Sequence, residues 1–78
     1  MWSKNGEYYN LIGINAGVIW QLLSDRGRLS IRELGEHTCL SSLNLGLAIG
    51  WLARENNITF IKNGEILFVE LIDKSASL

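Results

Sequence analysis

The sequence has 78 residues, 47% of them hydrophobic, a formal net charge of −1 at pH 7 and no proline. This length makes one domain rather than two, and the hydrophobic fraction is that of a packed globular protein rather than a disordered one. The near-neutral charge argues against a strongly basic DNA-binding module, and the single cysteine, Cys39, excludes an intrachain disulfide and a multi-cysteine zinc site.

Residues 1–9 are polar and aromatic by turns, and we expect them to be irregular. A first helix is predicted over residues 11–25, because apolar residues recur at three- and four-residue steps. Asn10 is a candidate N-cap, and Gly27 is placed to end the helix in the left-handed conformation. The recurring apolar residues are Leu11, Ile14, Val18 and Leu22.

A capping box marks the start of a second helix. Ser30 is followed three residues later by Glu33, which predicts a helix over residues 31–38. Leu29 and Ser30 would add a short strand to a sheet formed downstream. Cys39, just after this helix, is expected to be a small buried apolar residue.

The third helix is predicted over residues 42–55. Ser41 and Ser42 are an N-cap signal, and Asn56 and Asn57 end the helix because Asn tolerates the left-handed conformation. The second and third helices, joined by a tight turn, have the form of a helix-turn-helix unit.

Beyond the third helix the apolar period changes from that of a helix to that of a strand. Residues 58–62 and 65–71 are rich in β-branched and aromatic residues, and the Asn63-Gly64 pair between them predicts a two-residue hairpin loop. Residues 73–78 are expected to fray.

This order of elements predicts an α+β fold, a winged helix-turn-helix domain over residues 10–72 in which three helices precede a β-hairpin wing. The alternative is a three-helix bundle with a loose hairpin. The Asn-Gly turn between two strand-like segments favours the winged helix.

Two segments carry a resemblance to a known family. IGINAGVIW (residues 12–20) and, more specifically, AIGWLARE (residues 48–55) resemble the signature segments of a small prokaryotic winged helix-turn-helix family of uncharacterised function. The resemblance covers residues 12–71 and implies the fold and a stand-alone domain. It implies little about activity, because a fold does not determine a function.

The outward face of the third helix distinguishes between functions. A helical projection places Leu45, Ala48, Ile49 and Leu52 on the core face. The opposite face carries Leu43, Leu47, Trp51 and Arg54, whereas a DNA-reading helix presents Arg, Lys, Gln or Asn near its N-terminus to the bases.

Three kinds of cover would satisfy this apolar face. One is intramolecular, from Trp2, from Tyr8-Tyr9 or from the wing. Another is a second chain, most simply in a symmetric homodimer, and the last is a small molecule. We therefore predict a non-enzymatic regulatory or adaptor domain that acts by protein association, with Leu43, Leu47 and Trp51 at the interface with a protein partner.

The alternative function is a DNA-binding transcriptional regulator with weak, mainly phosphate-directed contacts to double-stranded DNA. Its groove residues would be Ser41, Ser42 and Asn44. Its phosphate contacts would come from four basic residues, Arg26, Arg28, Arg32 and Lys62. The pattern favours a solvated surface over phosphate contacts for these basic residues, because Asp25, Glu33 and Glu36 are interleaved with them and cancel much of their field.

Glycines recur one turn apart in both long helices. Gly13 with Gly17 and Gly46 with Gly50 predict a close approach between the first and third helices, with Trp20 and Trp51 filling the space beside them. The alternative is that Gly13 lies outside the first helix and shapes its entry.

No set of nucleophile, base and orienting group can be assembled from this sequence, so we predict no enzymatic activity, no metal and no cofactor. The single histidine, His37, is expected on a helix surface. The first residues lack the apolar core of a signal peptide, and no apolar run reaches the length of a membrane span. We expect a soluble, cytoplasmic domain.

Overall fold

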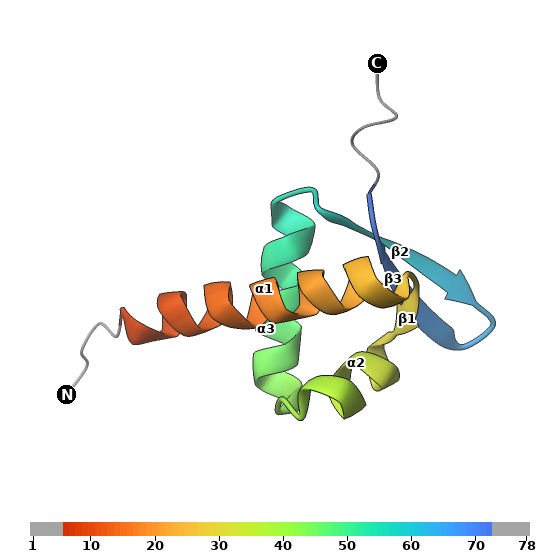
Figure 1. Ribbon diagram of the computed structural model, residues 1–78. Helices are drawn as coiled ribbons and strands as arrows, with labels where there is room; N and C mark the ends of the chain where they lie inside the picture. Colours follow the sequence, from red (N-terminus) through yellow and green to blue (C-terminus); the bar gives the residue numbers. More distant parts are fainter. Residues whose placement is uncertain (1–5, 73–78) are drawn as a thin grey trace, which may run out of the picture.

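The elements follow the predicted order. The computed structural model describes residues 6–72. The helices are α1 (Glu7–Arg26), α2 (Ile31–Thr38) and α3 (Ser42–Arg54), and the strands are β1 (Leu29–Ser30), β2 (Ile58–Asn63) and β3 (Ile66–Leu71). In Figure 1, α1 crosses α3 steeply, and α2 and the sheet lie on one side of that crossing. The predicted α+β winged helix-turn-helix fold is confirmed.

The core lies where α1, α2, α3 and the sheet meet. Four side chains, one or more from each of α1, α2 and β3, are almost completely buried. They are Ile19, Leu23, Leu34 and Val69. From α3 the predicted core face is buried as expected, with no member more than 7% exposed: Leu45, Ala48, Ile49 and Leu52.

Helix α1 begins earlier than the sequence pattern predicts. It starts at Glu7, with Gly6 at the N-cap position, so residues 7–9 are helical rather than irregular and Asn10 is not the cap. The carboxylate of Glu7 in the first turn complements the partial positive charge of the helix N-terminus. The remainder of the expected irregular segment, residues 1–5, and the expected frayed segment, residues 73–78, lie outside the described residues.

The apolar residues whose spacing predicted α1 are mostly not the ones that form its core face. Leu11, Ile14 and Val18 are 39%, 65% and 51% exposed. The buried face is instead formed by Ala16, Ile19 and Leu23, together with Asn15. Because α1 carries apolar residues on almost every side, their periodicity indicates a helix without singling out one face.

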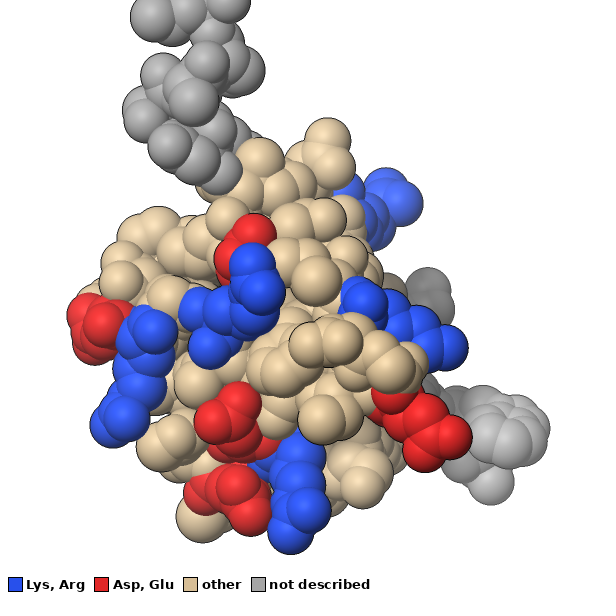
Figure 2. All heavy atoms as spheres, turned by 90° about the vertical axis from the view of Figure 1, so that its right-hand side faces the viewer, with Lys and Arg blue, Asp and Glu red and all other residues tan. Residues whose placement is uncertain are grey.

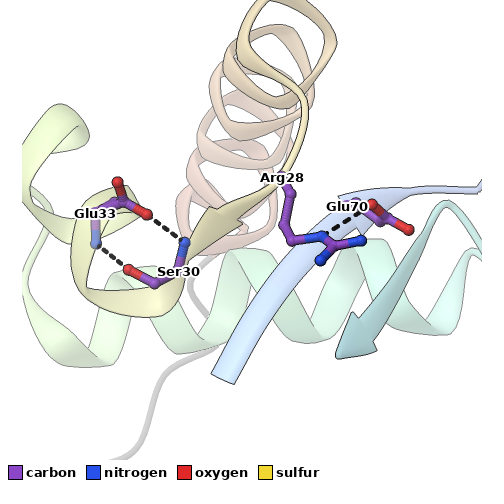
Figure 3. A network of polar contacts seen from close by, with 4 residues as sticks. All are labelled: Arg28, Ser30, Glu33 and Glu70. Atoms are coloured by element: carbon purple, nitrogen blue, oxygen red, sulfur yellow. Dashed lines mark hydrogen bonds and ion pairs between the residues drawn. The ribbon is translucent and has the colours of Figure 1, made fainter. Parts of the chain in front are cut away.

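The capping box at the start of α2 is confirmed (Figure 3). The Ser30 hydroxyl accepts a hydrogen bond from the Glu33 amide at 3.0 Å, and the Ser30 amide donates to Glu33 Oε1 at 2.8 Å. At the other end of α2, Cys39 has a left-handed conformation with φ +57° and is exposed. The prediction of a buried Cys39 is wrong, because the turn that ends α2 places this residue at the surface.

The sheet is antiparallel with the order β1-β3-β2, and the predicted short strand is present. The hairpin loop, however, is displaced by one residue from the prediction. Asn63 pairs with Ile66, which leaves Gly64 and Glu65 as the loop. Gly64 has φ +64° while Asn63 lacks a positive φ, so the loop places glycine first, as type II′ turns do.

The predicted glycine-mediated contact between α1 and α3 is wrong. A Cβ atom added at Gly13, Gly17, Gly46 or Gly50 would meet no atom within 4 Å. The two helices do cross, but through other residues. All four glycines therefore lie on helix surfaces that no described part of the chain covers closely.

Candidate protein-interaction surface

Helix α3 carries an exposed apolar stripe on the side away from the core. Leu43, Leu47 and Trp51 follow one another at four-residue steps and are 64%, 37% and 39% exposed. We call these three residues the α3 stripe. Its three side chains keep more than a third of their surface, so the described part of the chain does not bury it.

The α3 stripe lies in a region without charge. No Asp, Glu, Lys or Arg occurs between Glu36 and Arg54. Gly46 and Gly50 lie on the same side of the helix with open space at their Cα atoms. A partner can therefore approach the backbone of α3 closely, and it meets apolar side chains along the stripe, with one cation, Arg54, at the C-terminal end of the helix.

A second exposed apolar surface lies at the N-terminal end of α1. In Figure 1 the first turns of α1 extend past α3, and no other described element lies beside them. We call residues 7–14 the α1 arm. Four apolar side chains of the arm are exposed, at 48%, 71%, 39% and 65% respectively: Tyr8, Tyr9, Leu11 and Ile14.

The sequence prediction missed the α1 arm as a surface. It treated residues 1–9 as irregular and considered Tyr8 and Tyr9 only as a cover for the α3 stripe. In the structure both tyrosines are themselves exposed on α1, and the proposed cover by Trp2 lies outside the described residues. The signal that marks the arm is the absence of any charged residue from Tyr8 to Ser24.

Two of the four predicted phosphate-binding residues form ion pairs with carboxylates. Arg28 Nε lies 3.3 Å from Glu70 Oε2 (Figure 3), and Arg32 Nε lies 3.6 Å from Glu36 Oε2. Both pairs are exposed, so they contribute little to stability but reduce the local positive charge.

The other two basic residues, Arg26 and Lys62, are exposed and make no ion pair within residues 6–72. Figure 2 shows Lys and Arg alternating with Asp and Glu on the face it presents, with tan surface between them. On that face, opposite charges cancel much of the field that would attract phosphate.

The predicted groove residues lie at the start of α3, and one of them, Ser41, is the N-cap of this helix. The Ser41 hydroxyl accepts a hydrogen bond from the Asn44 amide at 3.1 Å and caps the helix. Ser42 is exposed, and Asn44 is half-buried. The cap engages the Ser41 hydroxyl, whereas Asn44 takes part in it through its backbone amide and not through its side chain.

Two surface hollows lie away from the α3 stripe. One, of about 300 Å³, is lined by residues of α1 and the end of α2, among them Asp25 and His37. The other, of about 390 Å³, lies between the start of α2 and the hairpin loop, with Arg32 and Glu65 on its wall. Neither is lined by the stripe, so neither supports a small molecule as its cover.

Within the described residues, no group of three or more His, Cys, Asp and Glu side chains is arranged to hold a metal ion. None of the helices there combines the length and the hydropathy needed to cross a membrane.

A known protein family matches the chain, and the match covers almost all of the described residues. A family model described as a winged helix-turn-helix domain (DUF2582) matches residues 4–71. No curated protein matches the chain.

Solved structures share the same fold. Protein BT2368 from Bacteroides thetaiotaomicron has a TM-score of 0.72 at 34% sequence identity, covering 80% of this chain and 76% of that one. HlyU from Vibrio cholerae N16961 has a TM-score of 0.63 at 21% identity, with 95% and 85% covered. An ArsR family transcriptional regulator, RHA00566, has a TM-score of 0.61 at 18% identity, with 91% and 77% covered. At these identities the last two show a likeness of fold alone.

Proposed function

The chain belongs to the DUF2582 family of winged helix-turn-helix domains, and from this premise we propose that it is a non-enzymatic regulatory or adaptor domain that acts by protein association, as a homodimer. The resemblance seen in residues 12–20 and 48–55 is thereby confirmed. A winged helix is a scaffold that also occurs in a transcriptional regulator, so the surface residues must decide how this chain uses it.

The observation that carries the proposal is the exposed α3 stripe. In a winged helix that reads DNA, this side of the helix faces the groove and supplies donors and cations. Here it supplies Leu43, Leu47 and Trp51, and Trp is enriched among residues that dominate binding energy at protein interfaces. A surface of this composition favours an apolar protein partner over a phosphate backbone.

The hydrophobic effect limits the binding free energy that the α3 stripe can supply by itself. Full burial of a large apolar side chain contributes about 1.5–3 kcal/mol, so burying the exposed fractions of these three contributes on the order of 2–4 kcal/mol per protomer. Association costs about 4–15 kcal/mol in lost freedom of motion. A stable dimer therefore needs the stripe and further surface beside it.

The test is the oligomeric state measured by size-exclusion chromatography with light scattering. We expect the wild-type chain to be dimeric and Trp51→Asp to shift it to monomer, because a carboxylate cannot be buried unpaired in an apolar interface. Trp20→Asp is the matched control, since Trp20 is similarly exposed, at 43% against 39% for Trp51, but lies on α1. Circular dichroism of both variants establishes that they remain folded.

A monomeric wild-type chain at high concentration would contradict the proposal. So would equal loss of dimer in the Trp20→Asp and Trp51→Asp variants, because the effect would then not be specific to the α3 stripe.

A second candidate, a DNA-binding regulator with mainly phosphate-directed contacts, is favoured by one observation: Arg26 and Lys62 are exposed and make no ion pair within the described residues. Its test is fluorescence anisotropy with a labelled duplex. Binding through these groups should be measurable at about 50 mM salt, should fall steeply as salt rises, and should weaken in Arg26→Ala and Lys62→Ala. Lack of binding at low salt excludes it.

A further inference from the structure

The core-facing side of α1 continues into the α1 arm, where no described element packs against it. Along this side the exposed fraction is 48% at Tyr8, 3% at Ala16 and 0% at Ile19. The helix therefore keeps an apolar composition for two turns beyond the point where its own core ends. The opposite side of the arm carries Ile14, which is 65% exposed, together with the polar residues Glu7 and Asn10.

A cluster of exposed large apolar side chains on a helix commonly marks a surface that a partner covers. We infer that the α1 arm docks on the α3 stripe of a second copy of this chain, and that the second copy returns its own arm in the same way. This inference rests on the proposed function and identifies the second half of the interface.

The dimensions of the two surfaces match. At 1.5 Å per residue, the arm of residues 7–14 is about 12 Å long. Leu43 and Trp51, at the two ends of the α3 stripe, are separated by the same length of helix, about 12 Å. One arm therefore spans one stripe, and a twofold axis produces two equivalent contacts.

The exposed apolar area is sufficient for a dimer of ordinary size. The seven apolar residues of the arm and the stripe together expose on the order of 500 Å² of surface per protomer. A standard interface buries about 800 Å² per partner, of which somewhat more than half is apolar. The arm and the stripe together supply that amount, and neither does so alone.

The charge pattern selects a second copy as the occupant. Residues 8–24 and residues 37–53 contain no Asp, Glu, Lys or Arg, so the only charged residue of the arm is Glu7, at its first position. The α3 stripe offers a charged peptide or a nucleic acid no counter-charge, whereas a second copy presents another mainly apolar surface. With a net charge of −1 per chain, two copies repel each other very little.

The open glycines fit the same arrangement. Gly46 and Gly50 on α3 and Gly13 on the arm have free space where a side chain would be, although each lowers the helix propensity of its own helix. Close approach of an arm from another copy gives these positions a packing role that the chain by itself does not.

The experiment uses two full-length variants that are designed to leave the fold intact. Tyr9→Glu changes the arm and Leu43→Glu changes the stripe. Both positions are highly exposed and lie in the first turn of a helix, where a carboxylate complements the helix dipole. Ser24→Glu, on the exposed far end of α1, is the control with the same charge change.

We expect each variant alone to be monomeric and the Ser24→Glu control to be dimeric in light scattering, with unchanged circular dichroism. Mixing the two variants should restore a dimer, because the intact arm of Leu43→Glu meets the intact stripe of Tyr9→Glu. The mixed dimer has one of the two contacts, so its dissociation constant should lie above that of the wild-type dimer.

The other outcomes separate the two proposals. If Tyr9→Glu remains dimeric while Leu43→Glu is monomeric, association through α3 stands and the role of the arm is overturned. If both variants are folded monomers and their mixture does not associate, the reciprocal contact is overturned. A monomeric wild-type chain removes the proposed function and the arm together.

Discussion

Glu33 determines where α2 begins, and its ionisation is coupled to the fold. Hydrogen bonding to the Ser30 backbone and then to the Ser30 side chain lowers the pKa of this carboxyl, and the charge of His37 lowers the pKa further, against an opposing effect of burial. A carboxyl whose pKa is lower in the folded than in the unfolded chain stabilises the fold when ionised. That contribution is complete above the ordinary value of about 4.3 and is lost as pH falls through the folded-state pKa.

The prediction concerns Glu33→Gln, which keeps the capping-box acceptor but removes the charge. The wild-type chain should exceed this variant in free energy of unfolding above pH 5 or so, and the difference should shrink towards zero as pH falls below about 4.3. Urea unfolding across this pH range measures it. A difference that does not change with pH would show that the carboxylate charge has no role in the cap.

Cys39 is a second residue whose local conformation affects the stability of the fold. Its φ of +57° is costly for a residue with a Cβ atom, and its thiol makes only a long contact, 3.7 Å, to the Glu36 carbonyl oxygen.

We expect Cys39→Gly to raise the free energy of unfolding by about 0.5–1 kcal/mol, because glycine adopts this conformation without strain although it gains entropy in the unfolded chain. Cys39→Val should lower it, since a β-branched side chain is strained at positive φ. Asn56→Gly is the matched control at φ +62° and should change stability less, because Asn tolerates this region. Chemical unfolding of the three variants measures these changes.

At the scale of elements, glycines inside two helices lower the stability of the chain. Glycines inside α1 and α3 have open space around them, so no packing among residues 6–72 compensates for their low helix propensity. Gly27 and Gly64 differ from them, because their φ values of +82° and +64° lie in the left-handed region, which glycine adopts without the strain that a side chain brings.

Gly17→Ala should stabilise the chain by about 1 kcal/mol, which for a domain of this size corresponds to a rise in Tm of about 4–8 °C. Gly17 lies outside both the α1 arm and the α3 stripe, so this change should leave association intact. Gly27→Ala is the contrasting variant and should lower Tm through backbone strain. Calorimetry at one protein concentration compares them, and a lower Tm for Gly17→Ala would mean that Gly17 has a packing role.

At the scale of the whole molecule, association and folding are linked. A dimer that buries the α1 arm and the α3 stripe stabilises the folded chain by mass action, so its thermal stability depends on protein concentration. Because the α3 stripe is apolar and Glu7 is the only charged residue of the arm, the association should depend weakly on salt, whereas phosphate-directed DNA binding falls steeply with salt.

We therefore expect the Tm of the wild-type chain to rise with protein concentration, and the Tm of Leu43→Glu to be independent of it. The wild-type dissociation constant should change little between low and high salt. Scanning calorimetry and sedimentation equilibrium provide the two measurements, and a dimer that dissociates on addition of salt would point to an interface made by charges rather than by these surfaces.

The features that could be predicted from sequence are those set by interactions within a few residues. The capping box of Ser30 and Glu33, the start of α3 after Ser41 and the end of α3 at Asn56 all depend on local hydrogen bonds and local backbone preferences. The apolar outward side of α3 could also be predicted, because Leu43, Leu47 and Trp51 share one side of any helix over these residues, whichever way the chain folds.

The tertiary structure decided the features that depend on which surfaces meet. It set the rotation of α1, leaving Ile14 and Val18 outside, and it left the interior glycines facing solvent. It also moved the hairpin loop to Gly64-Glu65, since the loop follows from pairing along both strands rather than from the Asn-Gly pair alone. The α1 arm became visible only once its position beyond α3 was known. A helix that is apolar all round carries no local mark of its buried side, and only packing against distant parts of the chain selects it.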